Sequence, residues 1–246
     1  MGWTCRMSNM GIECRDIAYE VEGRRFVGFL ADGSGAQRTP GVLVAHEGRG
    51  FTRHAKDRAV MLAELGYVAF APDYFGEPAR SLEHAFELMN VYIVSPALYA
   101  AHGRQALNIL RAHPKVDGNR LAAIGFCWGG FAVLELACSE DLRCVVGFHP
   151  GLSLCPLSNA SNISAKVLIC VGDRDPHVPA KDRESFIAQM NDAGVDCQVL
   201  LLLGAPHSFT NPEPYPYPID ATGVGYNAAA DRRSWIAMRS LFAEAL

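Results

Sequence analysis

The stretch "RLAAIGFCWGGFAVLELAC", residues 120–138, decides the fold. It opens with an apolar run that is typical of a buried strand and closes with a run that has the composition of a helix. A residue at so sharp a turn between strand and helix has a strained, usually positive-φ backbone, and side chains two positions away would collide. Gly125 and Gly129 occupy those two positions around Cys127. The pattern G-x-C-x-G therefore predicts a nucleophile elbow, rather than a cysteine that merely packs between glycines.

Strand-like and helix-like segments alternate along the rest of the chain. The strand-like runs lie at 25–31, 41–47, 67–73, 120–126, 144–150, 166–173 and 197–204, and the helix-length segments at about 55–65, 97–112, 128–138, 179–193 and 226–245. Most of the strand-like runs are apolar on both faces, as central parallel strands must be. Residues 14–31 read as an antiparallel hairpin that turns at Glu22 and Gly23. The alternation predicts an α/β fold with a mostly parallel, doubly wound sheet of about seven or eight strands and helices on both faces.

Length and composition favour one domain over residues 1–246. Half of the chain is apolar, which is enough for a sizeable core. Two stretches interrupt the alternation, 74–96 and the proline-rich 211–225. Because such segments are rarely helix or central strand, we expect both to be loop excursions near the site.

Charge and cysteine usage exclude several classes of protein. The net charge of -4 comes from interspersed acids and bases, so neither nucleic acid nor an anionic membrane is an expected partner. The first residues lack a basic segment followed by an apolar one, and no apolar run reaches about 18 residues, so we expect a cytoplasmic protein. Eight cysteines without a C-x-x-C pair indicate reduced thiols. The histidines never show the spacing of metal ligands, so we expect no metal and no cofactor.

Acid and base candidates follow two later strands. In elbow enzymes the chain order is nucleophile, acid, base. The segment "GDRDPHVP" supplies Asp173 and Asp175 after the strand at 166–173, and Asp175 lies farther out, where it could reach a neighbouring histidine. His207 lies in the loop "LLLLGAPHSFTNP", where a histidine is better placed for catalysis than for core packing.

Two backbone amides are candidates for an oxyanion hole. The amide after the nucleophile belongs to Trp128, at a helix N-terminus that favours thiolate and a developing oxyanion. The strand at 41–47 ends where this fold supplies its second donor, so Gly48 is the other candidate. Glu47 beside it is unusual for a simple hydrolase, because a carboxylate near a thiolate opposes ionisation of the thiol.

Five motifs together resemble the dienelactone hydrolase family of α/β-hydrolases. They are "AHEGRG", "YVAFAPDYFG", "GFCWGG", "GDRDPHVP" and "PHSFT", and they occur in the family's order from about residue 15 to the C-terminus. The resemblance implies the α/β-hydrolase fold and a triad of Cys127, His207 and Asp175. It also implies that Glu47 hydrogen-bonds the resting thiol and swings away when substrate arrives.

The resemblance also directs attention to the substrate pocket. Family members hold a substrate carboxylate with two arginines, one of them four residues beyond the catalytic histidine, where this chain has Asn211. Arg49, Arg53 and Asn211 are therefore candidate substrate-binding residues. Phe209 is a candidate for an apolar wall together with Trp128, Tyr215 and Tyr217.

The sequence thus predicts a hydrolase that cleaves a small-molecule carboxylic ester or lactone through a thioester on Cys127. Two alternatives stay open: a non-catalytic ligand-binding module that keeps the hydrolase fold, and a redox sensor that uses Cys127 as a reactive thiol. The oligomeric state is not fixed by the sequence.

Overall fold

The computed structural model describes residues 6–7, 11–152, 157, 159–217 and 222–246. In these residues nine strands form one sheet in the order β1-β2-β3-β5-β4-β6-β7-β8-β9. The strands are β1 (Arg6–Met7), β2 (Ile12–Val21), β3 (Arg24–Asp32), β4 (Thr39–Ala45), β5 (Val68–Ala71), β6 (Val116–Phe126), β7 (Cys144–Phe148), β8 (Lys166–Gly172) and β9 (Cys197–Leu202). Strands β5, β4, β6, β7, β8 and β9 pair in parallel in that order, and β1, β2 and β3 form an antiparallel edge. The predicted α/β fold is confirmed, with the two-residue strand β1 as an addition.

The predicted hairpin at the antiparallel edge is confirmed. β2 and β3 pair from Glu13 with Asp32 to Val21 with Arg24. The two residues between them, Glu22 and Gly23, both have positive φ, as a tight hairpin turn of this kind requires.

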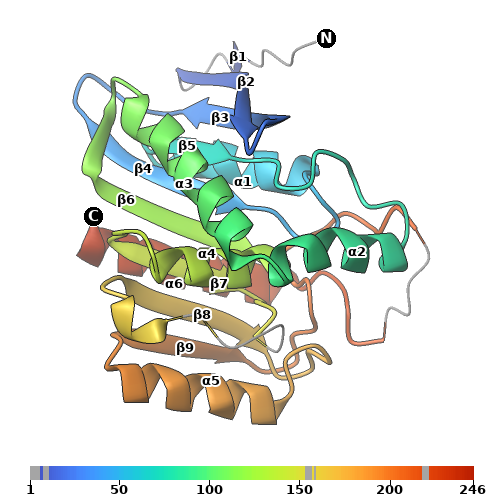
Figure 1. Ribbon diagram of the computed structural model, residues 1–246. Coiled ribbons are helices and arrows are strands. Elements are labelled where there is room, and N and C mark those ends of the chain that lie inside the picture. The colour runs from blue at the N-terminus through green and yellow to red at the C-terminus, as the bar shows by residue number, and fades with distance from the viewer. Residues whose placement is uncertain (1–5, 8–10, 153–156, 158, 218–221) are drawn as a thin grey trace.

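Helices cover both faces of the sheet (Figure 1). They are α1 (Arg53–Ala63), α2 (Leu82–Ile93), α3 (Pro96–Ala112), α4 (Trp128–Ala137), α5 (Ala180–Ala193) and α6 (Ala228–Ala245), with a 3-10 turn at Ala160–Asn162. α1 and α6 contribute to the apolar core on one face, and α3, α4 and α5 contribute to the core on the other. Since parallel strands end at the same edge, the loops after β4, β6, β7, β8 and β9 meet there.

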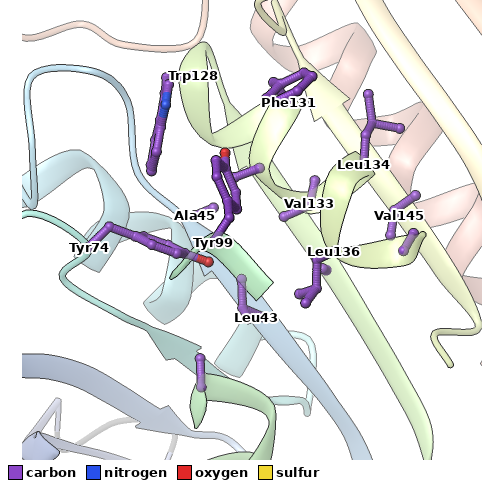
Figure 2. Packing of buried hydrophobic residues seen from close by; sticks show 14 of the residues in the cluster. Leu43, Ala45, Tyr74, Tyr99, Trp128, Phe131, Val133, Leu134, Leu136 and Val145 are labelled. Carbon is purple, nitrogen blue, oxygen red and sulfur yellow. The ribbon is translucent and has the colours of Figure 1, made fainter. Parts of the chain in front are cut away.

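The core beneath α4 is rich in aromatic rings. Trp128 is fully buried and lies 5.3 Å, between ring centroids, from both Tyr74 and Tyr99. Figure 2 shows these rings beside Leu43 and Ala45 of β4, with the apolar side chains of α4 nearby. Each large apolar side chain buried in this way stabilises the fold by about 1.5–3 kcal/mol. The start of α4, which carries Cys127, is therefore anchored in the core.

The prediction that residues 74–96 form a loop excursion is wrong, because α2 occupies 82–93. The side chain of Ser81 caps the helix by accepting the N–H of His84 at 3.1 Å. Ala85, Met89 and Tyr92, spaced as on one helix face, are buried. Residues 211–217 contain no helix or strand, as predicted, and 218–221 of the other predicted excursion lie outside the described residues.

Two further findings concern membranes and thiols. None of the helices in the described ranges has the length and apolar character that crossing a membrane requires. The structure describes free thiols at Cys127, Cys144, Cys170 and Cys197. Cys5 and Cys155 lie outside the described residues.

Candidate active site

Cys127 stands on a strained turn between β6 and α4. Its backbone has φ 53 and ψ -118, a conformation that residues other than glycine rarely adopt. A Cβ at Gly125 would overlap the carbonyl of Gly129, and a Cβ at Gly129 would overlap the carbonyls of Ala45 and His46. Both glycines are therefore required by close backbone approach, and the elbow geometry predicted from the sequence is present.

His207 and Asp175 come to Cys127 from the loops after β9 and β8. His207 Nδ1 lies 2.7 Å from Asp175 Oδ2, and both residues are only 3% exposed. The other carboxylate oxygen of Asp175 accepts the backbone N–H of His177 at 2.8 Å, which fixes the carboxylate. The Cys127 side chain lies near enough to His207 to raise the pKa of the imidazole. The imidazole thus lies between the carboxylate and the thiol, as general base chemistry requires.

The charge state of His207 follows from its neighbours. Burial alone would lower its pKa, but the Cys127 thiolate and the hydrogen bond to Asp175 raise it to about 10. A histidine with this pKa is protonated at neutral pH when the thiol is ionised. The charged imidazole would then lie beside the sulfur, where its positive charge stabilises a thiolate.

Asp173 is not the partner of His207. Its Oδ1 accepts the backbone N–H of Gly204, which ties the loop after β8 to the loop after β9. This carboxylate is exposed, whereas Asp175 is buried against the imidazole. The geometry thus distinguishes Asp175, the acid that the sequence analysis favoured, from Asp173.

Trp128 and Gly48, the two candidate oxyanion donors, lie at the site. Both residues line one cavity together with Cys127 and His207. Within the described ranges neither amide donates a hydrogen bond to another protein group. Two amides that have no acceptor beside a nucleophile are suited to hold an oxyanion.

That cavity has a volume of about 210 Å³ and a mostly apolar lining. Its wall includes Leu82, Phe86 and Met89 of α2, so the helix that the sequence analysis missed shapes the site. Tyr215 and Tyr217 line the cavity as predicted. A larger hollow of about 700 Å³ is lined by residues of α4, α5 and the segment before β8, and Cys127, Asp175 and His207 are not among them.

Glu47 contacts Arg49 and Asn211 rather than the thiol. Its Oε2 lies 3.1 Å from both Nε and Nη2 of Arg49 and accepts Asn211 Nδ2 at 2.6 Å. Its Oε1 is buried without a hydrogen-bond partner in the described part of the chain. Burial would raise the pKa of Glu47, but neighbouring positive charge and the Asn211 hydrogen bond hold it at about 2. Because burial lowers the pKa of His54 to about 4, Arg49 is the neighbour that is charged at neutral pH.

The structure places the predicted substrate-binding residues at different sites, and not all of them line the cavity. Arg49 lines the cavity. Arg53 was wrongly placed there, because it is exposed at the start of α1 and pairs with Asp57 one turn along the helix. Phe209 was also misplaced, since it is fully buried in the core against His149. Asn211 binds Glu47 and is not among the residues that line the cavity.

His149 is a residue that the sequence analysis passed over. It follows β7 with a φ of 39 and is fully buried. Its Nδ1 accepts the backbone N–H of Cys127 at 3.1 Å, and its Nε2 lies 2.8 Å from Thr210 Oγ1. Burial holds its pKa well below the usual value, which keeps Nδ1 an acceptor. The sequence did contain a signal for His149, because it directly follows β7, the strand that pairs with β6, and β6 leads into Cys127.

His177, in the loop after β8, also lines the cavity, and its ring centroid lies 4.7 Å from that of His207. Burial lowers its pKa, so its ring is neutral beside the protonated His207. Among the described residues, no three His, Cys, Asp or Glu side chains come together as metal ligands.

The sheet order, the elbow and the loops at the carboxyl edge define an α/β-hydrolase. The family model of the dienelactone hydrolase family matches residues 26–246, and the chain belongs to that family.

Solved structures and a curated relative agree with this assignment. The solved structure named m3DLH is 37% identical, covers 96% of this chain and 99% of its own, and has a TM-score of 0.89. The dienelactone hydrolase-like promiscuous phosphotriesterase P91 from metagenomic libraries is 36% identical, with coverage of 95% and 98% and a TM-score of 0.88. A probable 2-oxo-3-(5-oxofuran-2-ylidene)propanoate lactonase of Bradyrhizobium sp is 29% identical over 79% of this chain and 82% of its own.

Proposed function

We propose that this protein hydrolyses carboxylic esters or lactones through a covalent thioester on Cys127. One observation carries the proposal: the thiol on the strained elbow lies near His207, and His207 is hydrogen-bonded to Asp175, inside a cavity with two unbonded amides. Several curated relatives have names of the same class, including putative carboxymethylenebutenolidases of Synechocystis and Yersinia pestis.

Acylation begins with the thiolate. The Cys127 sulfur attacks the carbonyl carbon, and the new oxyanion is held by the amides of Trp128 and Gly48, each worth about 3 kcal/mol of barrier. As the tetrahedral intermediate collapses, the carbon–oxygen bond to the alcohol breaks and protonated His207 gives its proton to the departing alkoxide. The product of this half-reaction is a thioester and a neutral imidazole.

Deacylation uses the same groups in reverse. His207, held by Asp175, takes a proton from a water molecule that attacks the thioester carbon. The carbon–sulfur bond then breaks, the acid leaves, and the sulfur returns as the thiolate beside the imidazolium. In a lactone the leaving alkoxide stays attached to the acyl group, so one ring-opened product results.

Hydrolysis of phosphate triesters is a second candidate activity. It is favoured by the 36% identity over nearly the whole chain to a promiscuous phosphotriesterase and by an apolar cavity that suits an uncharged ester. The thiolate would attack phosphorus and displace one alkoxide or aryloxide, which leaves with the proton of His207; water activated by His207 would then cleave the phosphorus–sulfur bond and release the diester and the thiolate.

The test is turnover of p-nitrophenyl esters, an unsaturated five-membered lactone and diethyl p-nitrophenyl phosphate. Cys127→Ala should lower kcat on each substrate that the wild type cleaves by at least about 10⁴-fold. Cys197→Ala is the matched control, because that thiol is also half-buried but lies on β9 and not among the residues that line the cavity. Turnover that survives in Cys127→Ala would refute the nucleophile. A wild type that turns over none of the substrates, yet shows a peroxide-dependent mass increase at Cys127, would favour the redox alternative.

A further inference from the structure

Among the described residues that line the catalytic cavity, one has a lysine or arginine side chain, and that residue is Arg49. It is 4% exposed, and its partners account for most of its hydrogen-bonding capacity. Nε and Nη2 each face Glu47 Oε2, while Nη1 faces the backbone carbonyls of Glu213 and Pro214, both at 3.2 Å. Three of the five N–H bonds of the guanidinium, one on Nε and two on Nη1, are thus engaged in hydrogen bonds, and Nη2 forms an ion pair with the same Glu47 oxygen.

The flat face of Arg49 is occupied as well. Its guanidinium carbon lies 4.0 Å from the centroid of the Tyr215 ring, a cation–π contact. Tyr215 and the two acceptor carbonyls belong to the segment 213–215, so Arg49 holds this segment over the cavity. An arginine in this position serves the loop and Glu47, and an incoming anion would have to displace both.

Glu47 completes this arrangement from the opposite side. With a pKa of about 2 it is charged throughout the neutral range. Its Oε1 is buried without a partner in the part of the chain that the structure describes, and Glu47 lines the cavity. A substrate carboxylate drawn toward Arg49 would therefore meet an uncompensated carboxylate oxygen at the same place.

The charges around the cavity do not favour an anion. Glu47 and Asp175 are negative, and each is paired with a single positive partner, Arg49 or His207. His177, which also lines the cavity, is neutral because burial lowers its pKa. The remaining wall is largely apolar, with Leu82 and Phe86 partly exposed at α2.

We infer that this site accepts esters whose acyl group is uncharged and discriminates against acyl groups that carry a carboxylate, and that Glu47 is the residue that sets this preference by neutralising Arg49. The inference rests on the proposed esterase function and names its substrate class. An enzyme with an unpaired arginine in this cavity would have the opposite preference, because that arginine could hold a substrate carboxylate.

The test compares p-nitrophenyl hexanoate with mono-p-nitrophenyl adipate, which share a leaving group and chain length and differ in a terminal carboxylate. A substrate carboxylate would have to give up water in a largely apolar cavity whose arginine is already paired, which predicts a kcat/KM about 10- to 100-fold higher for the hexanoate. Glu47→Gln keeps the side-chain shape and frees the charge of Arg49, so it should narrow that ratio by about tenfold. Because the ratio is taken within one variant, a general loss of activity cancels.

Arg53→Met is the matched control. It removes an arginine that is exposed at the start of α1, and it should leave the ratio unchanged. The inference is overturned if the wild type prefers the adipate, or if Glu47→Gln leaves the wild-type ratio as it was.

Failure of the proposed function gives a different result, namely no turnover of either ester. Calorimetric binding of the same two esters to Cys127→Ala, which cannot form the thioester, measures the preference without turnover. Tighter binding of the hexanoate than of the adipate supports the inference, and equal or reversed affinities overturn it.

Discussion

Asp175→Asn removes one charge from a buried pair and leaves the shape of the side chain. In the wild type, Asp175 Oδ2 lies 2.7 Å from His207 Nδ1, and the pKa of His207 is about 10. A hydrogen bond to a charged group contributes about 1.5–3 kcal/mol. At 1.36 kcal/mol per pKa unit, its loss should lower the pKa of His207 by about 1–2 units, to roughly 8–9. The amide can also present N–H to the ring and favour the wrong tautomer, so kcat should fall by about 10²- to 10⁴-fold.

The assay has two readouts. NMR titration of the histidine rings gives the pKa of His207, and p-nitrophenyl ester hydrolysis gives kcat. Asp173→Asn is the matched control, because this residue lies in the same loop but bonds the amide of Gly204 instead of the imidazole. It should change neither readout. The reasoning is refuted if the pKa of His207 does not move in Asp175→Asn, or if the two variants lower kcat equally.

Three further predictions concern the support of the site and the fold. His149→Phe removes one of the two acceptors of the Cys127 amide, the other being the carbonyl of Phe148, and breaks the link to Thr210, so it should lower kcat by about tenfold with little change in KM, measured by steady-state kinetics. Gly129→Ala should lower the unfolding free energy by about 1–3 kcal/mol in urea denaturation, because the added Cβ would overlap the carbonyls of Ala45 and His46. Gly35→Ala, where a Cβ meets nothing within 4 Å, should stay within about 0.5 kcal/mol of the wild type. Asn227→Ala should cost about 1 kcal/mol in the same assay, because the Asn227 side chain accepts the N–H groups of Ala229 and Ala230 at the start of α6.

The parallel sheet was predictable because each central strand is buried on both faces and therefore reads as a continuous apolar run. The elbow was predictable for a different reason. Its geometry is local, and a strained turn leaves a short pattern of glycines around Cys127. The order of the elbow motif then pointed to two later strand ends, where Asp175 and His207 lie.

The sequence analysis missed α2 because the preceding residues contain glycine and proline, which obscured the helix start. The signal was nevertheless present in Ser81 as N-cap and in the spacing of Ala85, Met89 and Tyr92. Phe209 was misplaced because residues directly after His207 do not continue a regular pattern. Ser208 has a φ of 56, and this turn leads Phe209 into the core instead of the cavity.

The roles of Arg49 and His149 depend on contacts between distant segments, which no local pattern encodes. Arg49 meets the carbonyl of Glu213 across 164 positions of sequence. His149 bonds the amide of Cys127 and the side chain of Thr210, so it joins two loops that come together only when the sheet is formed. The roles of such side chains become visible only in the folded structure.

The account depends most on a covalent bond to one sulfur atom. A reaction with p-nitrophenyl acetate, quenched in acid during turnover and digested, locates the acyl group by peptide mass spectrometry. We predict an added acetyl mass on the peptide that contains Cys127 in the wild type and its absence in Cys127→Ala. An acetyl group on a different residue, or steady turnover by Cys127→Ala at the wild-type rate, would contradict the account.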